Sequence, residues 1–240
     1  MSESVTVRVA VVAAMEREVA PLVKGWRVVR KEHEGRSFRF YESGNWVVVC
    51  GGVGAEAARR TAEAVIGIYR PGKIYSAGFA GALGPEGKVG EIVVPRTVIN
   101  AGDGSRVELA EGEGVLVSFG AVAGVEQKAQ LRKSYSAQAV DMEAAAVARA
   151  AELRGVEFGA VKAISDEYDF DFPEMARFVD GTGQFSEMKF AGYAAVRPWL
   201  WRRLARLARN SWSASRGLCD RLERLQGTRQ GLAKVSAVSK

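Results

Sequence analysis

Short apolar runs alternate with stretches of helical periodicity along most of this 240-residue chain. The runs Val5–Ala13, Asn45–Cys50 and Phe158–Ile164 have the length of strands. The first two are rich in valine, which is typical of parallel strands buried on both faces. Neither an internal repeat nor a linker interrupts the alternation. The pattern therefore predicts a single α/β domain with three layers, in which helices cover a central sheet.

Composition narrows the class of protein. The 48% apolar and 26% charged shares are ordinary for a globular domain, and no apolar run reaches the roughly 18 residues of a membrane span. The first residues lack the features of a signal peptide, so we expect a cytoplasmic protein. His33 is the single histidine, which argues against a Ser–His–Asp triad and a multi-histidine zinc site. Cys50 and Cys219 lack metal-binding spacing, so we expect reduced structural cysteines and no metal.

Basic residues are concentrated near the C-terminus. Eleven Lys and Arg residues but only two acidic ones lie from Arg197 onward, so this part carries +9 and the rest of the chain −3. Leucine recurs at steps of three and four over residues 198–226, which predicts an amphipathic basic helix, interrupted or bent near Gly217. We expect residues 227–240 to form a disordered tail. The helix either packs its apolar face on the domain or docks on an anionic membrane surface.

Carboxylates stand at the ends of predicted elements. Glu143 begins an alanine-rich helix, and Asp166 follows the last apolar run. A helix start and a strand end of this kind are expected to share a pocket at one edge of the sheet. Glu16 and Glu18 lie in the first turn of the helix after the first strand. They either stabilise the helix dipole on a solvated face or serve the same pocket.

The glycine turn after the second strand resembles a cofactor motif only loosely. Gly52–Ala57 matches the weakest form of the dinucleotide-binding fingerprint. No acid that could hold a ribose follows the next strand, and this is not the first strand–helix unit, so we reject a dinucleotide site. The glycines still allow backbone N–H groups to approach whatever the pocket holds.

Five motifs occur in a defined order, namely MEREVAPL, GGVGAEAA, SAGFAGALGPEGKVGEIVVP, VDMEAAAVA and KAISD. Together they resemble the family of purine nucleoside and uridine phosphorylases and methylthioadenosine/S-adenosylhomocysteine nucleosidases, over roughly Val9–Asp166. The resemblance implies cleavage of the N-glycosidic bond of a nucleoside. It also implies a mixed central sheet flanked by helices, in a domain that spans residues 1–226 and includes the basic helix. Family members usually assemble, so a homodimer is expected.

The resemblance also implies roles for individual residues. Asp166 matches the acid beside the purine N7, Glu143 the carboxylate on the ribose hydroxyls, and Glu18 the base that activates water in hydrolytic members. Met142 matches a methionine packed on the sugar, although a core position is the alternative. The other expected substrate-binding residues are Val53, Gly78 and Phe79 on the sugar side, Val122 in the base slot, and Ser165.

Two departures from the family pattern bear on the nucleophile. Phosphorylases of this kind usually carry a glycine and an arginine near the first strand, whereas this chain has Ala13–Met15. Phe79 stands where a serine is expected. These departures weaken the case for phosphate as a co-substrate. They do not exclude it, because Arg17, Arg96 and backbone amides remain as groups that could bind phosphate. No other cofactor is expected.

The compact length, the VDMEAAAVARAA run and the acidic loop with Pro173 resemble one branch, the hopanoid-associated phosphorylases, whose inferred substrate is adenosylhopane. We therefore expect release of adenine from a 5′-substituted nucleoside, either this one or methylthioadenosine or S-adenosylhomocysteine, by phosphorolysis or hydrolysis. The alternative is a nucleoside-binding protein that has lost turnover and docks on lipid or nucleic acid through its basic helix. For the enzyme, the expected partners are a small nucleoside and the inner membrane face, not nucleic acid.

Overall fold

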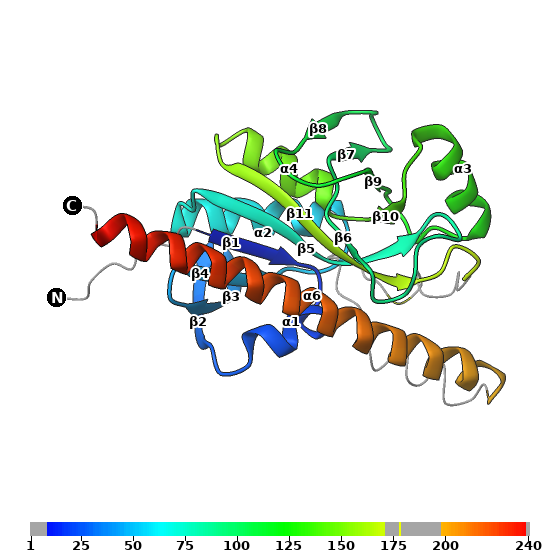
Figure 1. The fold of residues 1–240 in the computed structure, drawn as a ribbon, viewed down its shortest axis with the longest axis horizontal. Helices are drawn as coiled ribbons and strands as arrows, with labels where there is room; N and C mark the ends of the chain where they lie inside the picture. The colour runs from blue at the N-terminus through cyan, green and yellow to red at the C-terminus, as the bar shows by residue number, and fades with distance from the viewer. Residues whose placement is uncertain (1–8, 171–177, 179–197, 239–240) are drawn as a thin grey trace.

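The computed structural model describes residues 9–170, 178 and 198–238, and it has the predicted three-layer α/β architecture (Figure 1). The strands are β1 (Val9–Ala13), β2 (Arg27–His33), β3 (Arg36–Ser43), β4 (Trp46–Cys50), β5 (Lys73–Ala82), β6 (Ile92–Val93), β7 (Thr97–Asn100), β8 (Arg106–Glu108), β9 (Val115–Ser118), β10 (Ala139–Asp141) and β11 (Glu157–Asp166). The helices are α1 (Glu16–Val23), α2 (Ala55–Tyr69), α3 (Val125–Tyr135), α4 (Ala144–Glu152) and α6 (Pro198–Val238).

The strands form one mixed sheet between two layers of helices. Its main path is β2-β3-β4-β1-β5-β10-β9-β7-β8, and β11 pairs with β5 and β6. Helices α1 and α6 cover one face, and α2 and α4 cover the other (Figure 1). Alternate residues of β1 belong to different cores, because successive side chains of a strand point to opposite faces. Val11 packs with α1 and α6, whereas Val12 packs with α2 and α4, which explains the continuous valine run.

Two stretches of the chain form antiparallel hairpins. Strands β2 and β3 pair antiparallel, and so do β7 and β8. Strand β10 was not predicted. It pairs with the end of β5 and with β9, and so brings the start of α4 to the centre of the sheet. The acidic loop with Pro173 lies largely outside the described residues.

Helix α6 continues through Gly217 without interruption, so the predicted break there is wrong. A Cβ at Gly217 would lie 3.1 Å from the Gly90 carbonyl oxygen, so this glycine allows the helix to approach the loop before β6. Residues 227–238, expected as a tail, belong to the helix. Buried Leu218 and Leu222 pack in the core with α1, which confirms the packing interpretation of the apolar face. Within the described chain, no helix is both long and apolar enough to cross a membrane.

Strand β5 pairs with two different strands along one edge. The last pair with β1 is at Ser76, and the first pair with β10 is at Gly81. Strand β11 follows the opposite edge over nearly the whole length of β5. Among the described strands, none therefore pairs with residues 77–80 on the β1 side. The loop after β1 and the first turn of α1 cover this gap, and the candidate site lies here.

Candidate active site

A cavity of about 180 Å³ lies at the gap in the sheet. Eight of the nine residues predicted for the site line it, namely Glu18, Val53, Phe79, Val122, Met142, Glu143, Ser165 and Asp166. They come from segments far apart in the sequence. The ninth, Gly78, does not line the cavity but lies directly against Glu18.

Glu18 is buried in the first turn of α1, with 2% of its surface exposed. Its Oε2 accepts hydrogen bonds from the backbone N–H groups of Ala14 (3.0 Å) and Met15 (2.9 Å), and its Oε1 accepts one from Phe79 (3.2 Å). These donors lie after β1 and in the unpaired part of β5, where a backbone N–H needs a partner. Helix-start electrostatics on a solvated face is therefore the wrong interpretation of Glu18. It suits Glu16, which is exposed.

Gly78 leaves room for the Glu18 carboxylate. A Cβ at this position would lie 3.1 Å from Oε1 and 3.2 Å from Oε2 of Glu18, closer than side-chain carbons normally approach. The small residue in β5 therefore accommodates one of the protein's own carboxylates.

Glu143 is the N-cap residue of α4, and the surface it retains faces the cavity. Its Oε1 accepts a hydrogen bond from the backbone N–H of Gly54 (2.8 Å), and its Oε2 accepts a longer one from Met142 (3.3 Å). The glycine turn that resembles a dinucleotide motif thus directs an N–H group at a sugar-site candidate. Met142 lines the cavity beside it rather than lying in the core.

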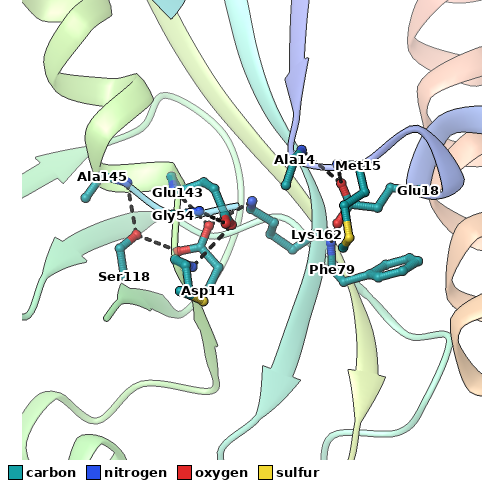
Figure 2. Close-up of polar contacts among 12 residues, drawn as sticks. Ala14, Met15, Glu18, Gly54, Phe79, Ser118, Asp141, Glu143, Ala145 and Lys162 are labelled. Carbon is teal, nitrogen blue, oxygen red and sulfur yellow. Dashed lines mark hydrogen bonds and ion pairs between the residues drawn. The ribbon is translucent and has the colours of Figure 1, made fainter. Parts of the chain in front are cut away.

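A buried lysine that was not predicted connects the carboxylates. Lys162 is 1% exposed, and its Nζ lies 2.7 Å from Oδ2 of Asp141. Asp141 also accepts hydrogen bonds from the Ser118 hydroxyl (2.5 Å) and the Ala144 N–H (2.8 Å). Figure 2 shows Lys162 between the Asp141 and Glu143 group on one side and Glu18 on the other.

Burial and the neighbouring charges set the protonation of this cluster. Burial raises the pKa of Glu18 above its usual value, although the Met15 N–H and Lys162 oppose the rise. Burial also raises the pKa of Glu143 to about 7, with Lys162 lowering it and Asp141 and Glu18 raising it further. Burial would lower the pKa of Lys162, but Asp141 and the two glutamates more than offset this, so its pKa is raised. Lys162 therefore stays cationic among three carboxyl groups, and both forms of Glu143 exist near neutral pH.

Asp166 ends β11 and also lines the cavity, with 23% of its side chain exposed. Its Oδ1 accepts a hydrogen bond from the hydroxyl of Ser165 (2.8 Å), which was predicted only as a substrate-binding residue. Its Oδ2 lies 2.5 Å from Nζ of Lys128, a residue of α3 that was not predicted. An acid candidate and a base candidate therefore line one cavity, with a sugar-site candidate, Glu143, beside them.

The outer wall of the cavity comes from α3, the end of β11 and α6. Residues 121–123 line the predicted base slot, and Val122 is 39% exposed. Leu207 and Ser211 of α6 line the opposite side, which was not predicted. Arg206 of α6 pairs with Glu167 at 3.2 Å, so the helix is tied to the chain after Asp166. In the described part of the chain, no group of three or more His, Cys, Asp or Glu residues could hold a metal ion.

Replacing Lys162 by methionine is expected to destabilise the protein by about 3–5 kcal/mol, because the Asp141 side chain, which is 0% exposed, would lose its cationic partner. Chemical denaturation measures the loss. Arg149→Met, which breaks the exposed ion pair with Glu152, is the matched control and should cost no more than about 1 kcal/mol. Equal losses in the two variants would contradict the role of Lys162.

Comparison with known proteins bears on the family and the fold. The sequence profile of the Phosphorylase superfamily matches residues 8–125 and 112–191. No curated protein sequence matches significantly. Similar solved structures include futalosine hydrolase of Helicobacter pylori, with 20% identity, a TM-score of 0.67, and 93% of this chain and 100% of that chain covered. Another is the 5′-methylthioadenosine/S-adenosylhomocysteine nucleosidase of Neisseria meningitidis in complex with methylthio-immucillin-A, with 21% identity, a TM-score of 0.66, and coverage of 89% and 95%. S-adenosylhomocysteine nucleosidase of Streptococcus pyogenes, in complex with 5-methylthiotubericidin, has 22% identity, a TM-score of 0.59, and coverage of 68% and 86%.

Proposed function

The chain belongs to the phosphorylase superfamily, and from this premise we propose that it hydrolyses the N-glycosidic bond of a 5′-substituted adenine nucleoside. Asp166 protonates the leaving base, Glu143 holds the sugar hydroxyls, and Glu18 takes a proton from the attacking water. These roles need an acid and a base that both reach one bound molecule, and the cavity places both carboxylates in its wall.

The observation that carries the proposal is the hydrogen bonding of Glu18. Phosphate would need several donors on the sugar side of the cavity, and apart from Arg17, which lines the cavity, these would be backbone N–H groups. The N–H groups of Ala14, Met15 and Phe79 already donate to the Glu18 carboxylate. A phosphate dianion would also meet the negative charge of Glu18 whenever that group is ionised. Water has neither difficulty, and a carboxylate with a raised pKa is a better base for deprotonating it.

The electrostatics of the cluster suit the charge that develops during bond cleavage. Loss of the base leaves a sugar with oxocarbenium character, and an ionised Glu143 beside it stabilises the positive charge. Burial raises the pKa of Glu143, and the positive charge of Lys162 lowers it. Lys162 therefore keeps this carboxyl group partly ionised near neutral pH. The proton that the base needs comes from Asp166, which lines the same cavity as the predicted base slot at residues 121–123.

The substrate class rests on the ligands of the similar structures. The similar structures are nucleosidases of 5′-methylthioadenosine and S-adenosylhomocysteine and a futalosine hydrolase, and two of them hold methylthio-immucillin-A and 5-methylthiotubericidin. This supports adenine as the leaving base and a thioether at the 5′ position. Adenosylhopane belongs in the substrate panel because the chain resembles the hopanoid-associated branch. A homodimer, a cytoplasmic location and contact of the exposed α6 arginines with a membrane stay predictions.

The alternative, a binding protein without turnover, rested on Phe79 in place of serine. Phe79 donates its backbone N–H to Glu18, and this contact does not depend on the side chain. The departure from the family pattern therefore gives no physical reason for lost activity, and we favour the enzyme.

The test is release of free base with and without phosphate. Purified protein is incubated with methylthioadenosine, S-adenosylhomocysteine, adenosine, futalosine and adenosylhopane, and the base and sugar products are quantified. We expect release of base and free sugar at a rate that phosphate does not change. Sugar 1-phosphate as the product would establish phosphorolysis instead, and folded protein that releases base from none of the five would defeat the proposal.

A further inference from the structure

Lys128 is a buried lysine on a helix that is otherwise mostly exposed. It and Leu131 are the buried residues of α3, and Lys128 is 2% exposed. Burying an ammonium group costs several kcal/mol unless partners replace its water. A leucine at this position would attach α3 to the domain without that cost. The charge therefore calls for an explanation other than helix packing.

All hydrogen bonds described for the Lys128 ammonium go to residues 166–170, namely to the last residue of β11 and the four residues after it. Nζ lies 2.5 Å from Oδ2 of Asp166, and it donates to the carbonyl oxygens of Glu167 (2.8 Å) and Phe170 (3.4 Å). Phe170 is itself part of the cavity wall. One cation thus holds both the proposed acid and the chain that encloses it.

The neighbouring strand leaves space for this ion pair. A Cβ at Gly81 of β5 would lie 2.9 Å from Oδ2 of Asp166 and 3.2 Å from Cε of Lys128. Gly81 is also the position that pairs with Asp166 in the sheet. The backbone at Gly81 would accept an alanine, since its φ is not positive, so the constraint is one of space.

We propose that Lys128 is a positioning residue for the acid step, an inference that rests on the proposed function. As the N-glycosidic bond breaks, its electron pair passes to the base, and the proton of Asp166 passes to a ring nitrogen of that base. Asp166 is left as a carboxylate, and the ammonium of Lys128 stabilises the charge through Oδ2. The Ser165 hydroxyl holds Oδ1 from the other side, so the carboxyl group has one orientation toward the base.

The test compares a leaving group that needs a proton with one that does not. Lys128→Met should lower kcat on the adenine nucleoside roughly 10- to 100-fold with little change in KM, because a charge-assisted hydrogen bond is lost in the transition state. On 4-nitrophenyl β-D-ribofuranoside, whose phenolate leaves without protonation, kcat should change by less than about threefold. Lys133→Met, on the exposed face of the same helix, is the control and should change neither.

A double-mutant cycle shows whether Lys128 acts through Asp166. Adding Lys128→Met to Asp166→Asn should lower kcat on the adenine nucleoside no further. If Lys128→Met does not fold, Gly81→Ala disturbs the same pair from the other side and should show the same preference between the two substrates. Equal losses on both substrates, or additive losses in the cycle, would overturn the inference. Failure of the wild type to release base would defeat the proposed function instead.

Discussion

Asp166→Asn is expected to lower kcat for base release by about 10²–10⁴-fold, the range that a general acid contributes. Asparagine has nearly the same shape, and its side-chain oxygen still accepts from Lys128, so the pocket keeps its form. It cannot hand a proton to the base, however. We therefore expect KM to change little, because the lost interaction exists only in the transition state.

Asp169→Asn is the matched control for this variant. Asp169 lies three residues further along and is exposed, so its amide should leave kcat unchanged. Steady-state kinetics with the adenine nucleoside measure both variants, and a substrate with a 4-nitrophenolate leaving group separates acid catalysis from binding. A fall of less than about tenfold for Asp166→Asn would mean that another group supplies the proton.

The fold was predictable because its signals are local. The valine run of β1 is buried on both faces, and the helical periods of α1, α2 and α4 mark the layers that cover the sheet. Strand β10 escaped prediction because three residues carry too little periodicity to be recognised. Its pairing with β5 and β9 provides the stabilisation that local propensity does not.

The carboxylates of the site were predictable from motif order, whereas their cations were not. Lys162 interrupts the apolar run of β11, which is a signal, but its partner Asp141 lies on another strand. Lys128 sits in a polar helix where nothing in the sequence marks it as buried. Buried ion pairs depend on which segments the fold brings together, and a single sequence does not contain that information. The choice between water and phosphate as the nucleophile could not be argued from the sequence either. It depends on which group accepts hydrogen bonds from the backbone N–H groups of Ala14, Met15 and Phe79.

Glu18→Gln is expected to lower kcat by about 10²–10⁴-fold. The glutamine oxygen still accepts from Ala14 and Met15, whereas the side-chain NH₂ group faces the Phe79 N–H and cannot accept from it. An amide also cannot take a proton from water. Glu16→Gln is the control from the same helical turn, since Glu16 is exposed and pairs with Arg39 instead of lining the cavity. Kinetics in phosphate-free buffer measure both variants, and a full rate for Glu18→Gln would show that water is activated elsewhere.

Stability distinguishes a catalytic role of Glu18 from a structural one. The pKa of Glu18 is raised in the folded protein from a usual value of 4.5, so the unfolded chain loses this proton at lower pH than the folded one. Folding stability therefore falls as the pH rises from that value to the folded pKa, and the ionised group costs stability above it. Glutamine does not ionise, so the unfolding free energy of the variant should depend less on pH than that of the wild type. The Phe79 N–H that loses its acceptor adds a cost that does not depend on pH. Glu18 would then lower the stability of the fold when it is ionised, while its replacement by a neutral group lowers turnover. This combination indicates a residue retained for catalysis rather than for stability.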